Sequence, residues 1–253
     1  MAAAFSRVGS WALRRSVAAA LMVMDMLVPV SPSFLFNHVP SADFVPFVHC
    51  FSDLIWPGEE MHQPVLDYTE HCYIEFIPRE SWQSAFSPTI RGVAITLLPQ
   101  YERAMSSMNK EKIARLKIKN NPEWAIRTMT PCLLHDTMIS AAYVDIKTVD
   151  RWWIIKEPMY LNEAEFRGYW FDDTIKSKTK DMLISYYILP KKAPYKYLVI
   201  AGNYNRTEAE LGIEKLNLPH TAIRELWNGI DVKEKDLKSM KIPGNHFRIF
   251  GVK

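Results

Sequence analysis

The chain has 253 residues, of which 48% are apolar and 23% are charged, a composition typical of an ordinary folded protein of one large or two modest domains. Its formal net charge of +3 is too small, and its basic residues are too scattered, to favour nucleic acid as a partner. It has only nine glycines and no glycine-rich phosphate loop, so we expect no nucleotide and no other cofactor.

Aromatic side chains are abundant, with eight Trp, eleven Tyr and twelve Phe. A ring face offers apolar area to the C–H groups of sugars, so surplus rings often line carbohydrate clefts. The alternative is that these large side chains fill the core. Composition alone leaves both interpretations open.

The three cysteines, Cys50, Cys72 and Cys132, are an odd number with wide spacing, which predicts neither a disulfide framework nor a zinc cluster. The pairs His49-Cys50 and His71-Cys72 resemble metal ligands. Neighbours on a strand point to opposite faces, however, so neither pair would converge on one ion. We therefore expect no metal site.

The N-terminal 33 residues are rich in Ala, Met and Val and carry Arg7, Arg14 and Arg15, with no acid before Asp25. This pattern fits a secretory signal peptide, a mitochondrial presequence, or a leader that is not native to the domain behind it. No stretch reaches the roughly 20 apolar residues of a membrane span. The compartment stays open from the sequence.

Segment 34–157 alternates strand and helix patterns. Nearly continuous apolar runs at Phe44–Phe51 and Gly92–Leu98 predict strands buried on both faces, as in a parallel sheet. Tyr73–Ile77 is a further strand candidate. The first run is expected to end at Ser52-Asp53, and within the loop from Asp53 to Glu60 the residues Trp56 to Glu60 are expected to form a polar and aromatic turn.

Helical patterns lie between and after these runs. Glu80–Phe86 suits one face of a short helix, and Asn109–Leu116 and Val149–Ile155 are two more candidates. Asn121 followed by Pro122 predicts a capped helix start, and Pro131 is expected to end or kink that helix. The alternation indicates a partial (β/α)8-barrel segment.

After about Pro158 the pattern changes to strands at short spacing without helices. These strands are predicted at Phe166–Phe171, Met182–Leu189, Tyr195–Ala201, Ala222–Trp227 and Phe247–Val252. Such spacing favours a small antiparallel β-sandwich over residues 158–253. The predicted fold class is therefore α/β plus all-β, with a barrel segment followed by a sandwich.

Function in a βα-repeat fold resides on loops that leave the carboxyl ends of strands. The first such loop holds Asp53, Trp56, Glu59 and Glu60 around a Pro-Gly turn. Carboxylates accept hydrogen bonds from sugar hydroxyls or act as acid and base. The alternative is a solvent-exposed acidic turn.

Two further loops carry polar groups. Gln100 and Tyr101 directly follow a predicted buried strand and could orient a ligand, or could simply begin a helix. His135 and Asp136 follow an apolar run; a buried Asp could fix the tautomer of an imidazole, while the alternative is a polar pair at a helix end.

The following motifs occur in chain order: Phe51-Ser52-Asp53 with Trp56-Pro57-Gly58-Glu59-Glu60, Gly92-Val93 leading to Leu97-Leu98-Pro99-Gln100-Tyr101, Leu133-Leu134-His135-Asp136, Phe166-Arg167-Gly168-Tyr169-Trp170, Leu183-Ile184-Ser185-Tyr186-Tyr187, Tyr197-Leu198-Val199-Ile200-Ala201-Gly202-Asn203, Leu226-Trp227-Asn228-Gly229, and Ile242-Pro243 with Phe247-Arg248-Ile249-Phe250. Together they resemble the late part of the barrel and the C-terminal sandwich of large glycoside hydrolases related to the exo-β-N-acetylgalactosaminidases. The resemblance covers roughly residues 34–253 and depends on the order and spacing of its motifs rather than on any one of them.

The resemblance implies a hexosaminidase-like hydrolase of carbohydrate metabolism, in which an adjacent Asp-Glu pair assists attack by the N-acetyl group of the substrate. It also favours a secreted or periplasmic protein. This sequence has no Asp-Glu dipeptide, and segment 34–157 is about half of the roughly 250 residues of a complete barrel. We therefore expect a fragment that is inactive alone and that self-associates through exposed barrel edges.

Two alternatives remain from the sequence. The first is a non-catalytic carbohydrate-binding module, or a structural β-sandwich, that uses the C-terminal aromatics. The second is an organelle structural protein imported by its Arg-rich leader. In the principal interpretation the catalytic residues are unknown, the ligand is a carbohydrate, and the eight loop residues bind it.

Overall fold

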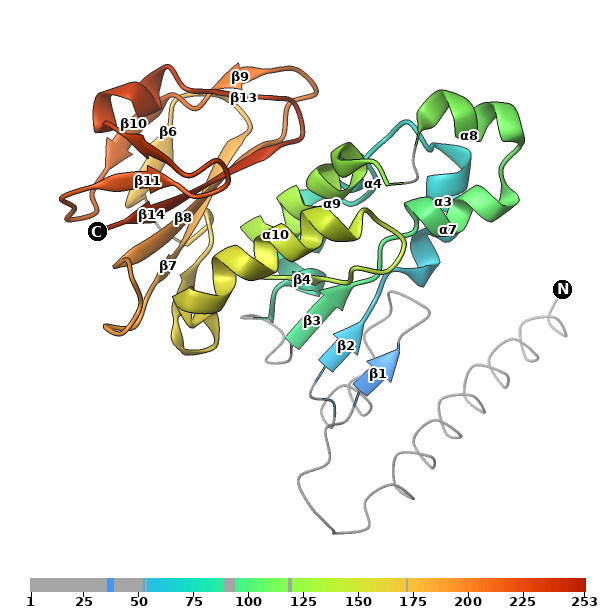
Figure 1. Ribbon diagram of the computed structural model, residues 1–253, viewed down its shortest axis with the longest axis horizontal. Helices are drawn as coiled ribbons and strands as arrows, with labels where there is room; N and C mark the ends of the chain where they lie inside the picture. Colours follow the sequence, from blue (N-terminus) through green and yellow to red (C-terminus); the bar gives the residue numbers. More distant parts are fainter. Residues whose placement is uncertain (1–35, 39–51, 53, 89–93, 118–119, 172) are drawn as a thin grey trace, which may run out of the picture.

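Figure 1 shows the computed structural model, which describes residues 36–38, 52, 54–88, 94–117, 120–171 and 173–253. The predicted leader, the strand predicted at Phe44–Phe51 and the candidate Asp53 lie outside the described residues. Among the residues that are described, no helix has the length and apolar character needed to cross a membrane.

Four short parallel strands form one sheet in which the spatial order equals the chain order. They are β1 (Phe36–His38), β2 (Leu54–Trp56), β3 (Ala94–Leu97) and β4 (Met138–Ile139). β3 confirms the described part of the strand predicted at Gly92–Leu98. β2 corrects the loop predicted from Asp53 to Glu60: Leu54–Trp56 is a strand that pairs with β1 and β3, and the turn begins at Pro57 instead of Trp56.

The strand predicted at Tyr73–Ile77 is wrong, because Tyr73–Phe76 forms the short helix α4. The β-forming composition is overridden by a capping box, in which the Cys72 backbone N–H donates to the Glu75 carboxylate at 2.9 Å. The helix then places the Tyr73 ring in the core, where it is fully buried. Local capping and burial together outweigh intrinsic strand preference here.

The predicted helices are confirmed. Lys110–Leu116 (α8) and Pro122–Leu134 (α9) begin after asparagine caps, and α9 continues beyond Pro131 to Leu134 instead of ending there. Ile146–Lys156 (α10) is capped by Asp145, whose carboxylate accepts from the Thr148 backbone at 3.0 Å. The other helical segments are η1 (Glu59–Met61), α3 (His62–Asp67), α5 (Arg79–Ser81), the π-helical turn η2 (Trp82–Phe86), α7 (Tyr101–Ala104), η3 (Met105–Ser107), η4 (Glu157–Met159), η5 (Leu161–Glu163) and η6 (Glu234–Lys238).

The C-terminal strands form a six-stranded antiparallel sheet with the order β12-β11-β14-β8-β7-β5. All five predicted strands contribute to it, although the first and fourth are shorter than predicted. Its members are β5 (Glu165–Arg167), β7 (Met182–Ile188), β8 (Tyr197–Asn203), β11 (Ile223–Glu225), β12 (Ile230–Val232) and β14 (Phe247–Val252). Two pairs complete the strands: β6 (Ile175–Ser177) with β10 (Ile213–Leu216), and β9 (Ala209–Glu210) with β13 (Lys241–Ile242).

This sheet is buried on both faces, which explains the continuous apolar runs. Along β8, Leu198 and Ile200 belong to the core shared with the helices, while Val199 and Ala201 belong to a second core against β6 and β10. Figure 1 shows α9 and α10 between the parallel sheet and the antiparallel sheet. The layers are therefore parallel sheet, helices, antiparallel sheet and small outer strands.

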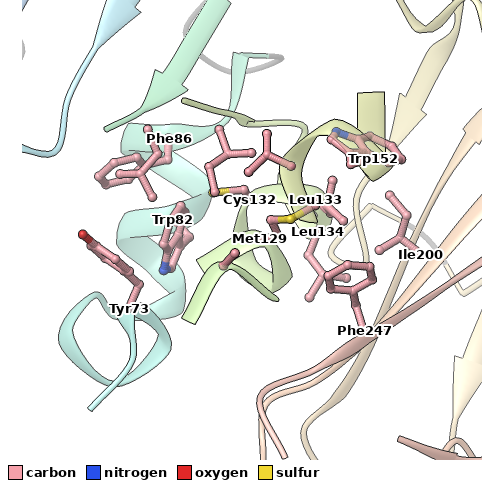
Figure 2. Close-up of a cluster of buried hydrophobic side chains, with 14 of the residues drawn as sticks. Tyr73, Trp82, Phe86, Met129, Cys132, Leu133, Leu134, Trp152, Ile200 and Phe247 are labelled. Atoms are coloured by element: carbon pink, nitrogen blue, oxygen red, sulfur yellow. The ribbon is translucent and has the colours of Figure 1, made fainter. Parts of the chain in front are cut away.

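The first core crosses the predicted boundary between segments 34–157 and 158–253. Figure 2 shows Leu133 and Leu134 of α9 close to Ile200 and Phe247 of the antiparallel sheet. At Gly202 the helix approaches so closely that a Cβ would overlap the Leu134 side chain. The described residues thus form a mixed α/β structure with a shared core and no closed barrel.

Candidate functional site

The loops that leave β2, β3 and β4 meet at the carboxyl edge of the parallel sheet. Gly58 has a φ of 130°, and a Cβ there would overlap the Leu98 carbonyl oxygen. The Leu98 backbone N–H donates to Pro57 O at 2.8 Å, and the Glu102 N–H donates to Tyr143 O at 3.1 Å. Only glycine allows the first loop to approach the second this closely. We call this edge the loop rim and define its functional groups below.

Both glutamates of the first loop are held in place. The Glu60 carboxylate accepts from the Gly58 backbone N–H at 2.9 Å, which stabilises the turn. The Glu59 carboxylate forms an ion pair with Arg103 of α7, and both side chains are partly exposed. The Arg103 guanidinium in turn lies 5.9 Å from the centroid of the Tyr143 ring. One cation thus connects the first loop to the third.

Trp56 and Tyr143 are the aromatic groups of the loop rim. Trp56 is the last residue of β2 and is half-buried. Tyr143 adopts a left-handed φ of 64° and leaves 40% of its surface exposed. An exposed ring beside a guanidinium that is itself paired with a carboxylate provides an apolar face and polar groups for the C–H face and the hydroxyls of a sugar.

Gln100 lies beneath the loop rim and is fully buried. Its backbone N–H donates to Tyr73 Oη at 2.8 Å, and its Nε2 donates to Leu98 O at 3.2 Å. Its Oε1 has no hydrogen-bond partner among the described residues. Because the side chain has no exposed surface, this acceptor lies under the loop rim and does not face solvent.

Tyr101 follows Gln100 but belongs to the core. Its ring is fully buried against Tyr73, with centroids 5.2 Å apart, and against Trp124 at 4.8 Å. Its hydroxyl donates to His71 O at 2.9 Å, and burial raises its pKa well above the ordinary value. Tyr101 therefore fits the interpretation in which this loop simply begins a helix. Gln100 is also buried, but its Oε1 has no hydrogen-bond partner among the described residues.

His135 lies at the opposite end of the parallel sheet, because it precedes β4 rather than following it. Its ring is stacked between Trp82, at 5.6 Å between centroids, and Trp170, at 5.2 Å. Burial lowers its pKa to about 4, so the imidazole is neutral. Its Nδ1 lies 2.7 Å from Pro131 O and its Nε2 lies 3.2 Å from Tyr169 Oη, which fixes the proton on Nδ1.

Asp136 does not orient the His135 imidazole, which corrects the mechanism considered for this pair. Its backbone has a left-handed φ of 60°, and its carboxylate accepts from Tyr187 Oη at 2.6 Å. Burial raises the pKa of Asp136 to about 6, and burial lowers the pKa of Lys156 nearby to about 8. The pair therefore has the helix-end position that was the alternative interpretation.

The structure thus brings four of the sequence candidates to the loop rim: Trp56, Glu59, Glu60 and Gln100. It also adds Arg103 and Tyr143, which the sequence did not single out. No spacing rule connects a glutamate to an arginine 44 positions later, and Tyr143 lay in a segment without a recognised motif. The contact between them follows only from the pairing of neighbouring strands.

In the part of the chain that is described, no three His, Cys, Asp or Glu side chains cluster as metal ligands. Comparisons of the chain with protein-family models, with curated proteins and with solved structures find no match. The resemblance to glycoside hydrolases therefore depends on the sequence motifs, and the site must be judged by its own geometry.

Proposed function

We propose that this protein is glycoside-hydrolase-like, that its loop rim binds a sugar, and that the chain does not cleave glycosides by itself. In this proposal the parallel sheet corresponds to part of a (β/α)8 barrel and the antiparallel unit to the sandwich that follows it. Strands in chain order with helices between them support the first correspondence. Ligands of barrel enzymes bind at the carboxyl ends of the strands, where the loop rim lies.

One observation carries the proposal: three consecutive strand exits converge. Gly58 contacts Leu98, and Glu59 is joined through Arg103 to Tyr143. The convergence places an exposed aromatic face beside charged hydrogen-bonding groups that are already ordered. Preordered groups lose little conformational entropy when a ligand binds, which favours a binding role.

The rim glutamates have the geometry of binding groups rather than of an acid and base. Hydrolysis requires a carboxyl group that delivers a proton to the leaving oxygen and a second group that attacks or orients the nucleophile. Glu59 is engaged by a guanidinium and Glu60 by a backbone N–H. The sequence also has no Asp-Glu pair to orient a substrate acetamido group. We therefore expect binding without turnover.

Calorimetric titration of the full chain with N-acetylgalactosamine and N-acetylglucosamine tests this proposal. Tyr143→Ala should abolish saturable binding. Tyr160→Ala is a matched control, because Tyr160 has nearly the same exposure, 39%, and a similar left-handed φ of 53° but lies in another region. Glu59→Gln should weaken binding, whereas Glu214→Gln on β10, an exposed glutamate away from the loop rim, should not.

Different results would refute the sugar site and the claim that the chain does not hydrolyse glycosides. Absence of binding to any neutral sugar, or equal losses in Tyr143→Ala and Tyr160→Ala, would refute the rim as a sugar site. Release of nitrophenol from a nitrophenyl hexosaminide by the purified chain, sensitive to Glu60→Gln, would refute the claim that the chain is non-hydrolytic.

A further inference from the structure

A second hollow lies at the far end of the antiparallel sheet, away from the loop rim. It has a volume of about 410 Å³ and is formed by the hairpin between β7 and β8 together with the end of β14, near the C label in Figure 1. We call it the hairpin hollow. Its size falls in the range of roughly 300–1,000 Å³ that is usual for small-ligand sites. Its lining residues are Ile188, Leu189, Pro190, Lys191, Ala193, Pro194, Tyr195, Lys196, Tyr197, Thr221 and Lys253.

The charged side chains that line the hairpin hollow are all lysines. Lys191, Lys196 and Lys253 line it and are exposed, and no Asp or Glu side chain lines it. None of these three lysines forms an ion pair with a described residue, whereas the neighbouring Lys192 pairs with Glu163. Ammonium groups gathered without a carboxylate side chain among the lining residues create a local positive potential that attracts anions.

The backbone at two of these lysines, Lys196 and Lys253, is fixed by hydrogen bonds. Lys196 is bonded on both sides, since its N–H donates to Val252 O at 2.8 Å and its carbonyl accepts from the Leu189 N–H at 2.9 Å. The Lys253 N–H donates to Ala222 O at 3.0 Å. Only the lysine side chains need to be ordered when an anion binds, which lowers the entropic cost of binding.

Tyrosine rings supply an apolar surface beside the ammonium groups. Tyr195 lies directly on Gly251 of β14, where an added Cβ would come within 2.7 Å of the ring. The Lys253 Nζ is 5.6 Å from the Tyr195 centroid. Tyr197, at the start of β8, also lines the hollow. A ligand that fits this site therefore combines negative charge with apolar C–H faces.

We propose that the hairpin hollow binds a short acidic oligosaccharide, whose carboxylates or sulfates meet the three lysines while its pyranose faces stack on the tyrosines. The choice of a sugar as the anion carrier rests on the proposed function. The geometry of a basic hollow with rings does not depend on it. A long polyanion is disfavoured, because only three uncompensated lysines gather here and the net charge of the chain is only +3.

Calorimetric titration of the full chain with trigalacturonate, at low and at physiological salt, tests this proposal. Maltotriose is the neutral probe of equal length, and sodium sulfate is the probe for a simple anion. The triple variant Lys191→Ala, Lys196→Ala, Lys253→Ala should weaken trigalacturonate binding at least roughly tenfold. The matched control is Lys233→Ala, Lys235→Ala, Lys238→Ala, which removes the same charge from exposed positions around η6.

Tyr195→Phe should retain binding, because the ring remains, and Gly251→Ala should reduce it, because a Cβ displaces the ring. If Gly251→Ala fails to fold, the charge reversal Lys191→Glu provides the same test at an exposed turn position. Equal losses in the two triple variants, equal affinity for maltotriose, or full competition by sulfate would each overturn the proposal.

The rim variant Tyr143→Ala distinguishes this proposal from the previous one. Trigalacturonate binding that survives in Tyr143→Ala supports an independent second site. Loss of that binding in Tyr143→Ala would overturn the hairpin hollow while leaving the loop rim as the sugar site.

Discussion

Tyr187 donates a 2.6 Å hydrogen bond to the carboxylate of Asp136, and this contact connects the end of α9 to the middle of the antiparallel sheet. Asp136 is the immediate neighbour of His135, which stacks between two tryptophans. The two residues have shifted pKa values whose effects on stability have opposite signs, so their substitutions lead to complementary predictions.

Asp136→Asn should remove a destabilising effect that grows with pH. The folded pKa of Asp136, about 6, lies above its ordinary 3.8, so between these values the folded state binds the extra proton and stability falls as pH rises. The shift corresponds to about 3 kcal/mol at most. Asparagine can still accept from Tyr187 and tolerates the left-handed φ. Urea unfolding between pH 4 and pH 7 should show the variant gaining on the wild type as pH rises; parallel curves would contradict this.

His135→Phe should remove a destabilising effect that grows as the pH falls, opposite in sign to that of Asp136. The folded pKa of about 4 lies below the ordinary 6.5, so between these values the unfolded state binds the extra proton and stability is lost as pH falls. The shift of this pKa also corresponds to at most about 3 kcal/mol in the free energy of unfolding. The variant should be less stable than the wild type at pH 7, because Pro131 O loses its hydrogen-bond donor. As the pH is lowered from 7 to 4, however, the variant should lose less stability than the wild type. Acid unfolding followed by tryptophan fluorescence measures both.

Gly58→Ala should disrupt the loop rim. The left-handed φ and the overlap with Leu98 O require the two loops to separate. We expect a loss of roughly 1–3 kcal/mol of stability and a loss of sugar binding. Gly229→Ala is the control, since Gly229 has a positive φ of 71° but only the Arg224 guanidinium within contact distance. Equal decreases in melting temperature in the two variants would show that the effect comes from the positive φ alone.

A chain truncated to begin at Pro158 should not fold stably, although the sequence pattern changes there. Ile200, Phe247 and Ile249 lose the α9 side chains that cover them. Exposed apolar faces of this kind promote aggregation. Size-exclusion chromatography and near-ultraviolet circular dichroism should show aggregated or molten material. A monomeric, cooperatively folded fragment would establish two independent domains.

The sequence predicted best where a local signal and the tertiary environment agree. The cap at Asn121 located the start of α9, and the apolar run at Phe247–Val252 gave β14 with both its ends. Both signals are encoded within a few residues of the element. They therefore do not depend on how distant segments pack.

Prediction failed where distant contacts decide. Tyr73–Ile77 has strand composition, but its capping box and the burial of Tyr73 select a helix. Leu54–Trp56 is too short to give a pattern and becomes a strand only because two neighbours pair with it. At the site, Arg103 and Tyr143 were missed because strand order, not spacing, brings them to Glu59.

The burial of both faces of β8 has a consequence for folding accuracy. A slip of one residue in most sheets moves apolar side chains into water, and that penalty fixes the alignment of the strands. In β8 a slip of one residue would exchange one apolar pair, Leu198 and Ile200, for another, Val199 and Ala201. The slip would therefore expose little apolar surface to water and would cost little hydrophobic free energy. The close contact between Gly202 and Leu134 fixes the register instead, because only a residue without a side chain lets α9 pack this closely on the strand.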